Sequence, residues 1–293
     1  MFTHLHVRSW FSFLAGGSSP EDLAQSAHLA GQQAIALTDV NGVYGAVRFQ
    51  QACRQTGLKS IIGAEITVGG HSLLLLAEDR HGYSNLCQLL TQHYTQDTPL
   101  SLADLHQRHE GLLCLSGGID SKLWHFAHAK QLGDARAWLN DLLETFGEHL
   151  YVELVNHHRR DGRYTVKTLT ALAHEYNLLT VATNDVRYAD PLAYPRYDLL
   201  TCAKLGITVH DPHPDRPTNA EAYLKDEVSM QEAVEVAVAH DTANIIAARC
   251  TLDLLQELVT TPSAQLPDAF SPDQQLANLC APNLIWKYNA ETR

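Results

Sequence analysis

An α/β fold built on a parallel sheet is predicted by two features of this 293-residue sequence. Up to about residue 190, apolar strand-like runs alternate with amphipathic helix-like runs, which is the pattern of strands joined by helices. Several apolar runs, such as 73–77 and 178–182, are nearly continuous and suit strands buried on both faces. Seven strand candidates favour a closed or nearly closed barrel over an open doubly wound sheet, although the residues alone fit either.

The individual elements follow from local signals. The apolar runs predict strands over 2–8, 34–40, 59–68, 71–78, 111–117, 149–155 and 179–186. The amphipathic segments between them predict helices over 20–31, 43–56, 82–95, 135–146 and 163–177. Ser19 is a cap followed by a proline and two acids, the usual start of a helix. Gly31 and Gly57 lie where helices are expected to end.

The pattern changes after residue 190. Residues 211–217 form a proline-rich connector that cannot be regular structure. Helices are expected over 219–224, 231–248 and 274–288, with a loop over 261–272. The sequence therefore predicts a barrel over 1–210 and a small helical extension over 211–293.

Composition narrows the class of protein. A net charge of −12 argues against strong autonomous binding of duplex DNA, because such binders usually carry a basic face. The six cysteines include no C-x-x-C pair, so a zinc ribbon is not indicated. No secretion signal begins the sequence, and no apolar run reaches the roughly 18 residues of a membrane span. We expect a cytoplasmic protein that does not enter a membrane.

Several strand ends carry polar residues. Asp39, Glu65 and Asp185 lie at the carboxyl ends of three strand candidates, where barrels of this type hold their functional residues. Four strand-like segments carry polar residues at or near their ends: His4-Leu5-His6-Val7-Arg8-Ser9, Ala34-Ile35-Ala36-Leu37-Thr38-Asp39-Val40, Ile61-Ile62-Gly63-Ala64-Glu65 and Val181-Ala182-Thr183-Asn184-Asp185-Val186-Arg187-Tyr188.

In order and spacing these segments resemble the polymerase-and-histidinol-phosphatase (PHP) domain at the N-terminus of bacterial C-family DNA polymerases. Both the DNA polymerase III alpha branch and the error-prone DnaE-type branch fit, and the sequence leaves the choice open. Segments 82–90 and 218–225 also match family helix starts. The resemblance covers nearly the whole chain and implies a distorted seven-stranded (β/α) barrel of TIM-like type.

The resemblance also implies a metal site from which most ligands are missing. Arg8, Val40 and Arg187 stand where the family has ligand histidines, while Leu14-Ala15-Gly16 lacks the family's aspartate and Gly118 cannot ligate. An arginine has no lone pair to offer a metal. The matching ligands that remain are His6, Glu65 and Asp185, and further candidates are His4, His157 and His158. We expect Asp39 to accept hydrogen bonds from backbone N–H groups of the following turn.

These departures predict a vestigial site comprising His6, Arg8, Asp39, Glu65, Asp185 and Arg187. No metal cofactor is expected, apart from weak residual binding of zinc, manganese or magnesium. A buried carboxylate that has lost its metal needs another cation. We therefore hypothesise that Arg8 and Arg187 occupy part of the former metal space and pair with Glu65 or Asp185, since guanidinium and carboxylate geometries match.

The resemblance implies a part in DNA replication or repair. The polymerase's catalytic aspartates belong to a palm that follows such a domain, so no nucleotidyl-transfer centre is expected in this chain. The expected role is a scaffold for the polymerase core, in cis or as a split fragment, and for a proofreading exonuclease, with DNA contacted only indirectly.

Two alternatives remain open. One is an active metal-dependent phosphoesterase, working as a 3′–5′ exonuclease, a pyrophosphatase or a histidinol-phosphatase-like enzyme. The other is a stand-alone binding module. The sequence does not decide whether the chain is an enzyme.

Overall fold

Residues 2–256 and 271–288 are described by the computed structural model. The chain divides into two compact units, residues 1–255 and 256–293. The first unit runs on beyond residue 210. The domain boundary expected at that residue stays a prediction. No helix among the described residues is long and apolar enough to cross a membrane.

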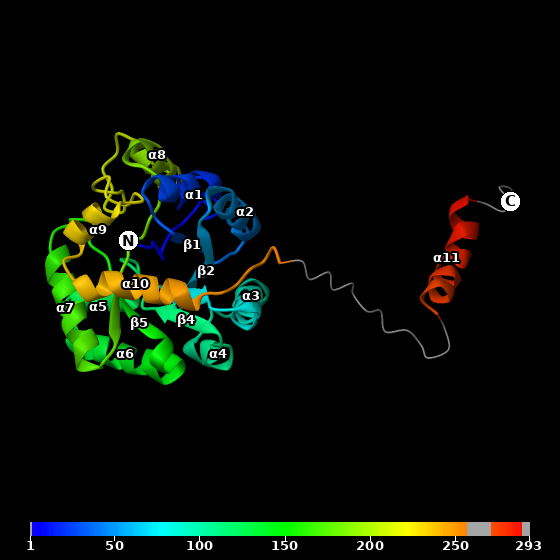
Figure 1. Ribbon diagram of the computed structural model, residues 1–293, viewed down its shortest axis with the longest axis horizontal. Coiled ribbons are helices and arrows are strands. Elements are labelled where there is room, and N and C mark those ends of the chain that lie inside the picture. The colour runs from blue at the N-terminus through cyan, green and yellow to red at the C-terminus, as the bar shows by residue number, and fades with distance from the viewer. Residues whose placement is uncertain (1, 257–270, 289–293) are drawn as a thin grey trace. The chain divides into compact units, whose positions relative to one another are not determined.

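The first unit is built on a curled, mixed sheet of six strands with helices around it (Figure 1). The strands pair in sequence order: β1 (Ala34–Val40), β2 (Lys59–Val68), β3 (His71–Ala77), β4 (Leu112–Leu115), β5 (Leu150–Leu154) and β6 (Leu179–Ala182). Neighbouring strands are parallel except at β3, which is antiparallel to both β2 and β4. Gly69 and Gly70 connect β2 to β3 with φ of 55° and 84°, as a tight hairpin turn requires.

The strand expected over residues 2–8 is not formed, so the seven-stranded count is wrong. This extended segment, which we call the N-terminal segment, makes isolated bridges from His4 to Ile35 and from Val7 to Val186. The N–H of Val7 donates to the Thr38 hydroxyl (2.9 Å) instead of to a strand carbonyl, which interrupts the ladder. The segment nevertheless lies between β1 and the residues after β6, at the opening of a half-barrel.

Helices surround the sheet. They are α1 (Pro20–Leu29), α2 (Ala46–Thr56), α3 (Arg80–Thr95), α4 (Leu102–Gln107), α5 (Lys122–His128), α6 (Leu132–Phe146), α7 (Gly162–Glu175), α8 (Tyr194–Leu205), α9 (Glu227–Ala233), α10 (Ala237–Arg249) and α11 (Pro272–Tyr288). Two short 3-10 turns are η1 (Gly147–His149) and η2 (Pro191–Ala193). Ser19 caps α1 through a capping box with Asp22, and Gly57 ends α2 in a left-handed conformation, as their sequence positions predict.

Other predictions about helices need correction. Helices α4, α5 and α8 were not predicted, and residues 219–224 are not helical because Tyr223 bridges Tyr188 instead. The helix expected over 231–248 is two helices, separated where Val234 and Val236 adopt extended backbone. Most of the loop expected over 261–272 lies outside the described residues, whereas the helix expected over 274–288 falls within α11.

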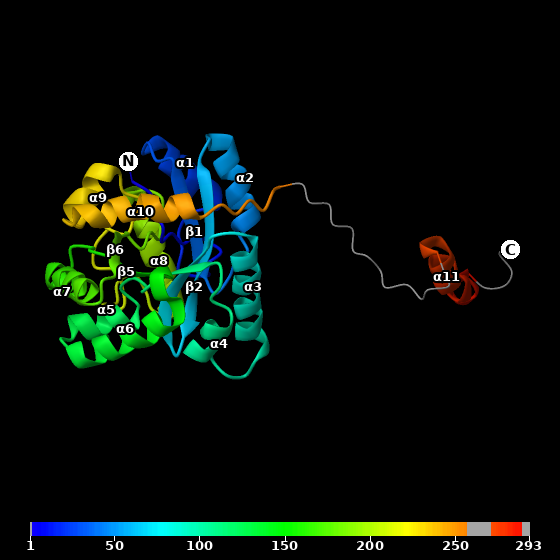
Figure 2. The same ribbon diagram turned by 60° about the horizontal axis from the view of Figure 1, so that its bottom comes forward.

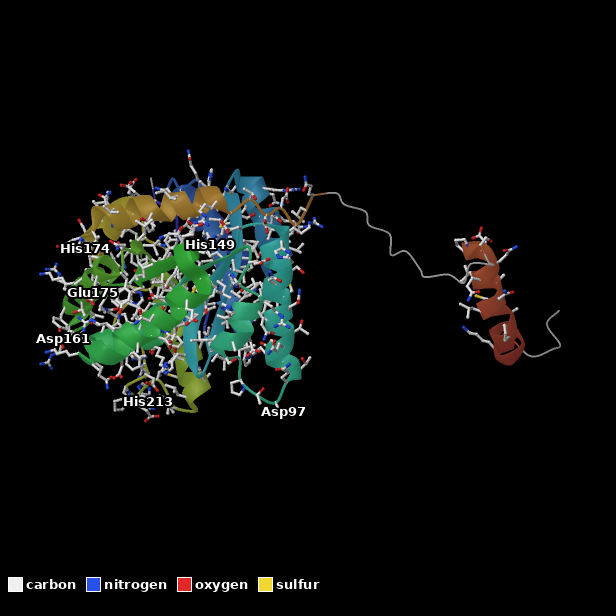
Figure 3. All side chains as sticks on the ribbon, turned by 90° about the horizontal axis from the view of Figure 1, so that it is seen from below. Asp97, His149, Asp161, His174, Glu175 and His213 are labelled. Atoms are coloured by element: carbon white, nitrogen blue, oxygen red, sulfur yellow. The ribbon has the colours of Figure 1, made fainter. Side chains whose placement is uncertain are left out.

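The barrel has two different ends. Helix α10 crosses the end where β2 begins, and Lys59 there donates to the Ala247 carbonyl (2.6 Å). At the same end Arg249 pairs with Glu78 (2.8 Å) and contacts His149 (3.0 Å). Figure 2 shows α10 running across the barrel, and Figure 3 shows His149 at this end and His213 at the other. The carboxyl ends of the parallel strands thus remain open on the side away from α10.

Candidate functional site

Polar side chains from several parts of the chain meet at the carboxyl ends of the strands. Glu65 lies in β2 opposite Val40, the last residue of β1. Glu153 lies near the end of β5, and Asp185 follows β6. The N-terminal segment supplies two cations, and the chain after Asp185 supplies a third. We call this group the buried charge network, and its members are His6, Arg8, Glu65, Glu153, Asp185 and Arg187.

His6 is at the centre of the network. Its Nδ1 lies 2.8 Å from Glu153 Oε1, and its Nε2 lies 3.1 Å from Glu65 Oε2 and 3.6 Å from Asp185 Oδ1. Burial alone would lower the pKa of His6, but the charges of Glu153 and Asp185 outweigh it and raise the pKa to about 10. His6 is therefore a cation whose two N–H groups both donate to carboxylates.

Arg8 is buried against Glu65. Its Nε and Nη2 both lie 2.7 Å from Glu65 Oε2, and Nη2 also lies 3.4 Å from Asp185 Oδ1. Burial would raise the pKa of Glu65, but Arg8 and His6 outweigh it and lower the pKa to about 2. The pairing of Arg8 with a strand-end carboxylate, which the sequence predicts, is present.

Arg187 makes the corresponding pair with Asp185. Its Nη2 donates to Asp185 Oδ2 (2.8 Å) and to Asp120 Oδ2 (2.9 Å), while its Nη1 donates to the Tyr197 hydroxyl (2.8 Å). Burial opposes the charge on Asp185, but Arg187 and Arg8 hold the pKa of that carboxyl well below its usual range. Asp185 has a φ of 40°, an uncommon backbone conformation for a residue with a side chain.

Two members of the site were missed by sequence reasoning. Glu153 is an isolated acid in an otherwise apolar strand, and a charge at a buried strand position was the signal that could have found it. Asp120 lies in the loop between β4 and α5, is 52% exposed and matches no motif. Its pKa is lowered, because Arg187 and Arg8 outweigh the effect of burial.

Asp39 has partners of its own. It accepts hydrogen bonds from the Ser9 N–H (2.7 Å) and from the hydroxyls of Ser9 and Ser12 (2.9 and 2.7 Å). The donated backbone N–H belongs to Ser9, the residue after the N-terminal segment, and not to the turn after β1 as expected. Burial raises the pKa of Asp39 in spite of these hydrogen bonds. Asp39 therefore ties residues 9–12 to β1.

Within the part of the chain that the structure describes, the three other candidate histidines form no hydrogen bond or ion pair with the carboxylates of the buried charge network. His4 Nε2 lies 2.9 Å from the Lys225 carbonyl, and His157 Nε2 lies 2.6 Å from the Asn184 carbonyl. Burial lowers the pKa of both His4 and His157 to about 4, so both are neutral. His158 is on the surface, 3.9 Å from Glu221. Their contacts are those of structural side chains.

The arrangement does not fit a divalent metal centre. His6 Nδ1 faces Glu153, which leaves Nε2, 3.1 Å from Glu65, as the ring nitrogen that could face a metal. Arg8 fills the space beside Glu65 and Asp185 with a fixed positive charge. A side chain at Gly118 would start 3.3 Å from the His6 ring, so this position faces the network and offers no ligand. Within residues 2–256 and 271–288, no group of three or more His, Cys, Asp or Glu is arranged to hold a metal ion.

A half-barrel with a charged site at the carboxyl ends of its strands is the architecture expected of PHP-type domains. The family model "PHP domain" matches residues 4–157, more than half of the chain, and the chain therefore belongs to the PHP domain family.

The proteins similar to this chain include bacterial polymerases. The error-prone DNA polymerase of Symbiobacterium thermophilum is 33% identical over 99% of this chain and 29% of that protein. The DNA polymerase III subunit alpha of Treponema pallidum is 30% identical over 92% of this chain and 25% of that protein. Among solved structures, an amidohydrolase from Chromobacterium violaceum matches 64% of this chain and 88% of that one, with 12% identity and a TM-score of 0.45. The chain thus spans less than a third of the length of the two polymerases.

Replacing Arg187 by alanine should be costly. Arg187 is only 15% exposed, and its removal leaves Asp185 buried with one guanidinium fewer. We expect Arg187→Ala to lower the free energy of unfolding by about 3 to 5 kcal/mol. The matched control is Arg163→Ala, since Arg163 pairs with Glu235 at 3.3 Å on the surface and should lose less than about 1 kcal/mol. Urea denaturation measures both variants, and an equal loss of unfolding free energy in Arg187→Ala and Arg163→Ala would contradict this prediction.

Stability should also fall at alkaline pH through His6. Its pKa is raised from 6.5 to about 10, so its contribution is complete below pH 6.5 and is lost as the pH rises towards 10. The pKa of Glu65 is lowered from 4.5 to about 2, so its contribution is complete above pH 4.5 and is lost towards pH 2. Urea denaturation between pH 6.5 and 9.5 should show a decline that His6→Gln removes and the surface control His158→Gln keeps. The same decline in wild type and His6→Gln would refute this assignment.

Proposed function

We propose that this chain is the PHP domain of a bacterial polymerase of the DNA polymerase III alpha or error-prone type, and that it acts as a metal-independent scaffold. The polymerase context is supported by the two relatives above, which match almost the whole of this chain. The scaffold role is supported by one observation, the buried charge network in place of a metal-ligand set.

The network favours a structural role for the following reason. A phosphoesterase of this type uses metals to polarise the phosphate and to generate hydroxide. Here the groups that could bind a metal are instead paired with Arg8, Arg187 and the His6 cation. Buried pairs of this kind hold their elements in one geometry, because breaking one leaves a charge without a partner. A fixed, self-neutralised site suits a domain that supports other parts of a polymerase.

The partners in this proposal are a polymerase core, in cis or as a separate fragment, and a proofreading exonuclease subunit. DNA would be reached only through these partners, in line with the net charge of −12. Such a function places the protein in the cytoplasm.

Metal analysis tests the scaffold proposal against an active phosphoesterase. Chain purified without chelator and then soaked in zinc and manganese should hold no stoichiometric metal, and EDTA should leave its melting temperature unchanged. Manganese should stimulate neither phosphatase nor exonuclease activity, and no primed template should be extended. A hydrolytic activity that is lost in His6→Ala and kept in His158→Ala would overturn the proposal, since His158 lies on the surface.

Binding to defined partners tests the other half of the proposal. The chain should form a complex with the purified polymerase core of its own organism, and that complex should retain the purified exonuclease subunit. An unrelated acidic α/β protein is the control for charge alone. Size-exclusion chromatography that shows no complex with either partner at micromolar concentration would sink the scaffold role and favour a stand-alone module.

A further inference from the structure

The outer face of α7 carries a strip of cations on an otherwise acidic chain. Arg163 and Lys167 are exposed one helical turn apart, and Arg160 is exposed just before the helix begins. Lys130, in the turn between α5 and α6, joins them because its Nζ lies 5.2 Å from the centre of the Tyr164 ring. We call these five residues the basic strip. It is a local exception in a chain whose net charge is −12.

Most cations of the basic strip have no anionic partner in the protein. Arg163 pairs with Glu235 at 3.3 Å, and both side chains are exposed. The side chains of Arg160, Lys130 and Lys167 form no hydrogen bond or ion pair with any residue that the structure describes. Helix α7 has no acid in its first turn that could neutralise them. Three cations are therefore available to external carboxylates, and a fourth is held only by a surface pair.

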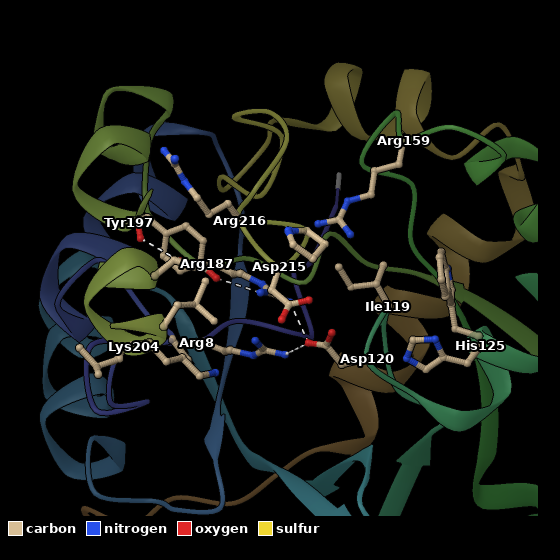
Figure 4. A pocket seen from close by; sticks show the side chains of 16 residues that line it. Arg8, Ile119, Asp120, His125, Arg159, Arg187, Tyr197, Lys204, Asp215 and Arg216 are labelled. Carbon is tan, nitrogen blue, oxygen red and sulfur yellow. Dashed lines mark hydrogen bonds and ion pairs between the residues drawn. The ribbon is translucent and has the colours of Figure 1, made fainter. Parts of the chain in front are cut away.

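The basic strip is a surface of its own, apart from the site at the strand ends. Figure 4 shows the neighbouring Arg159 directed into the pocket that opens beside the buried charge network, so Arg159 is not counted in the strip. Tyr164 is 42% exposed and adds an aromatic ring beside the cations. Tyrosine and arginine are residue types that are enriched where proteins bind one another. The strip thus has the composition of a protein-binding surface.

We propose that the basic strip docks a short acidic segment of a partner protein. The carboxylates of that segment would pair with Arg160, Arg163 and Lys167, and one apolar side chain would pack on Tyr164. Charge complementarity favours this partner. A long polyanion such as nucleic acid would also meet the acidic surface around the strip, whereas a short segment meets mainly the local cations, because salt screens charges beyond about 8 to 10 Å. The proposal goes beyond the scaffold role, since it assigns a surface and the chemistry of what binds there.

Fluorescence anisotropy with the full chain tests this proposal. The probe is a labelled oligoglutamate peptide with one central phenylalanine, and its control has glutamine at every glutamate position. The glutamate peptide should bind and the glutamine peptide should not. Lys167→Ala should weaken binding about fivefold, the size expected for one charge-assisted contact at a surface. Lys204→Ala is the matched control, because Lys204 is an exposed lysine on α8, outside the strip, and it should change affinity less than about twofold.

Glu235→Gln gives the decisive sign. Glu235 competes for Arg163, so its neutral variant should tighten binding of the glutamate peptide about threefold, the scale of a surface ion pair. An unchanged or lower affinity in Glu235→Gln would count against the proposal. Equal binding of the two peptides, equal effects of Lys167→Ala and Lys204→Ala, or tighter binding of single-stranded oligothymidylate that Lys167→Ala weakens would each overturn it. Metal content and polymerase capture are separate measurements, so the proposed function can fail or hold independently of this result.

Discussion

Three carboxylates buried at one end of a barrel are the constraint on which this structure depends. Glu65, Glu153 and Asp185 would repel one another and lose hydration unless cations lay among them. The chain supplies those cations itself, as the His6 imidazolium and two guanidinium groups. Two of the three cations belong to the N-terminal segment, which has only isolated bridges to the sheet. Charge pairing thus adds to the backbone hydrogen bonds that join this segment to β1 on one side and to Val186 on the other.

A network of fixed side chains differs from a metal centre in what it can do. A bound metal can leave, exchange and activate water, whereas an arginine carries a permanent charge and fixes the geometry of its partners. In the scaffold role that we propose, permanence is useful because the domain must keep one shape. At the edge of the network, Asp120 meets both guanidinium groups from a loop, where the pairing is open to solvent. Arg8 and Arg187 therefore take part both in the buried pairs and in the pairing with Asp120 at the edge of the network.

The sequence predicted the parts of the fold that depend on short, regular signals. Apolar runs located β1 to β6, and caps such as Ser19 and Gly57 located helix ends. The pairing of Arg8 and Arg187 with strand-end acids was also predictable, because the carboxyl ends of parallel strands converge. The missing seventh strand was not, since it depends on the Thr38 hydroxyl taking the N–H of Val7. Glu153 and Asp120 were missed because their roles arise only from distant elements meeting in space.

The charge state of His6 is the most direct measure of this account. Nuclear magnetic resonance of histidine-labelled protein at pH 8 reports whether the His6 ring carries protons on both nitrogens. The network predicts an imidazolium at this pH, because the neighbouring carboxylates raise the pKa to about 10. His4 and His157 should be neutral in the same spectrum, since burial lowers their pKa values to about 4. A neutral His6 ring at pH 8 would contradict the claim that side-chain cations hold this site together.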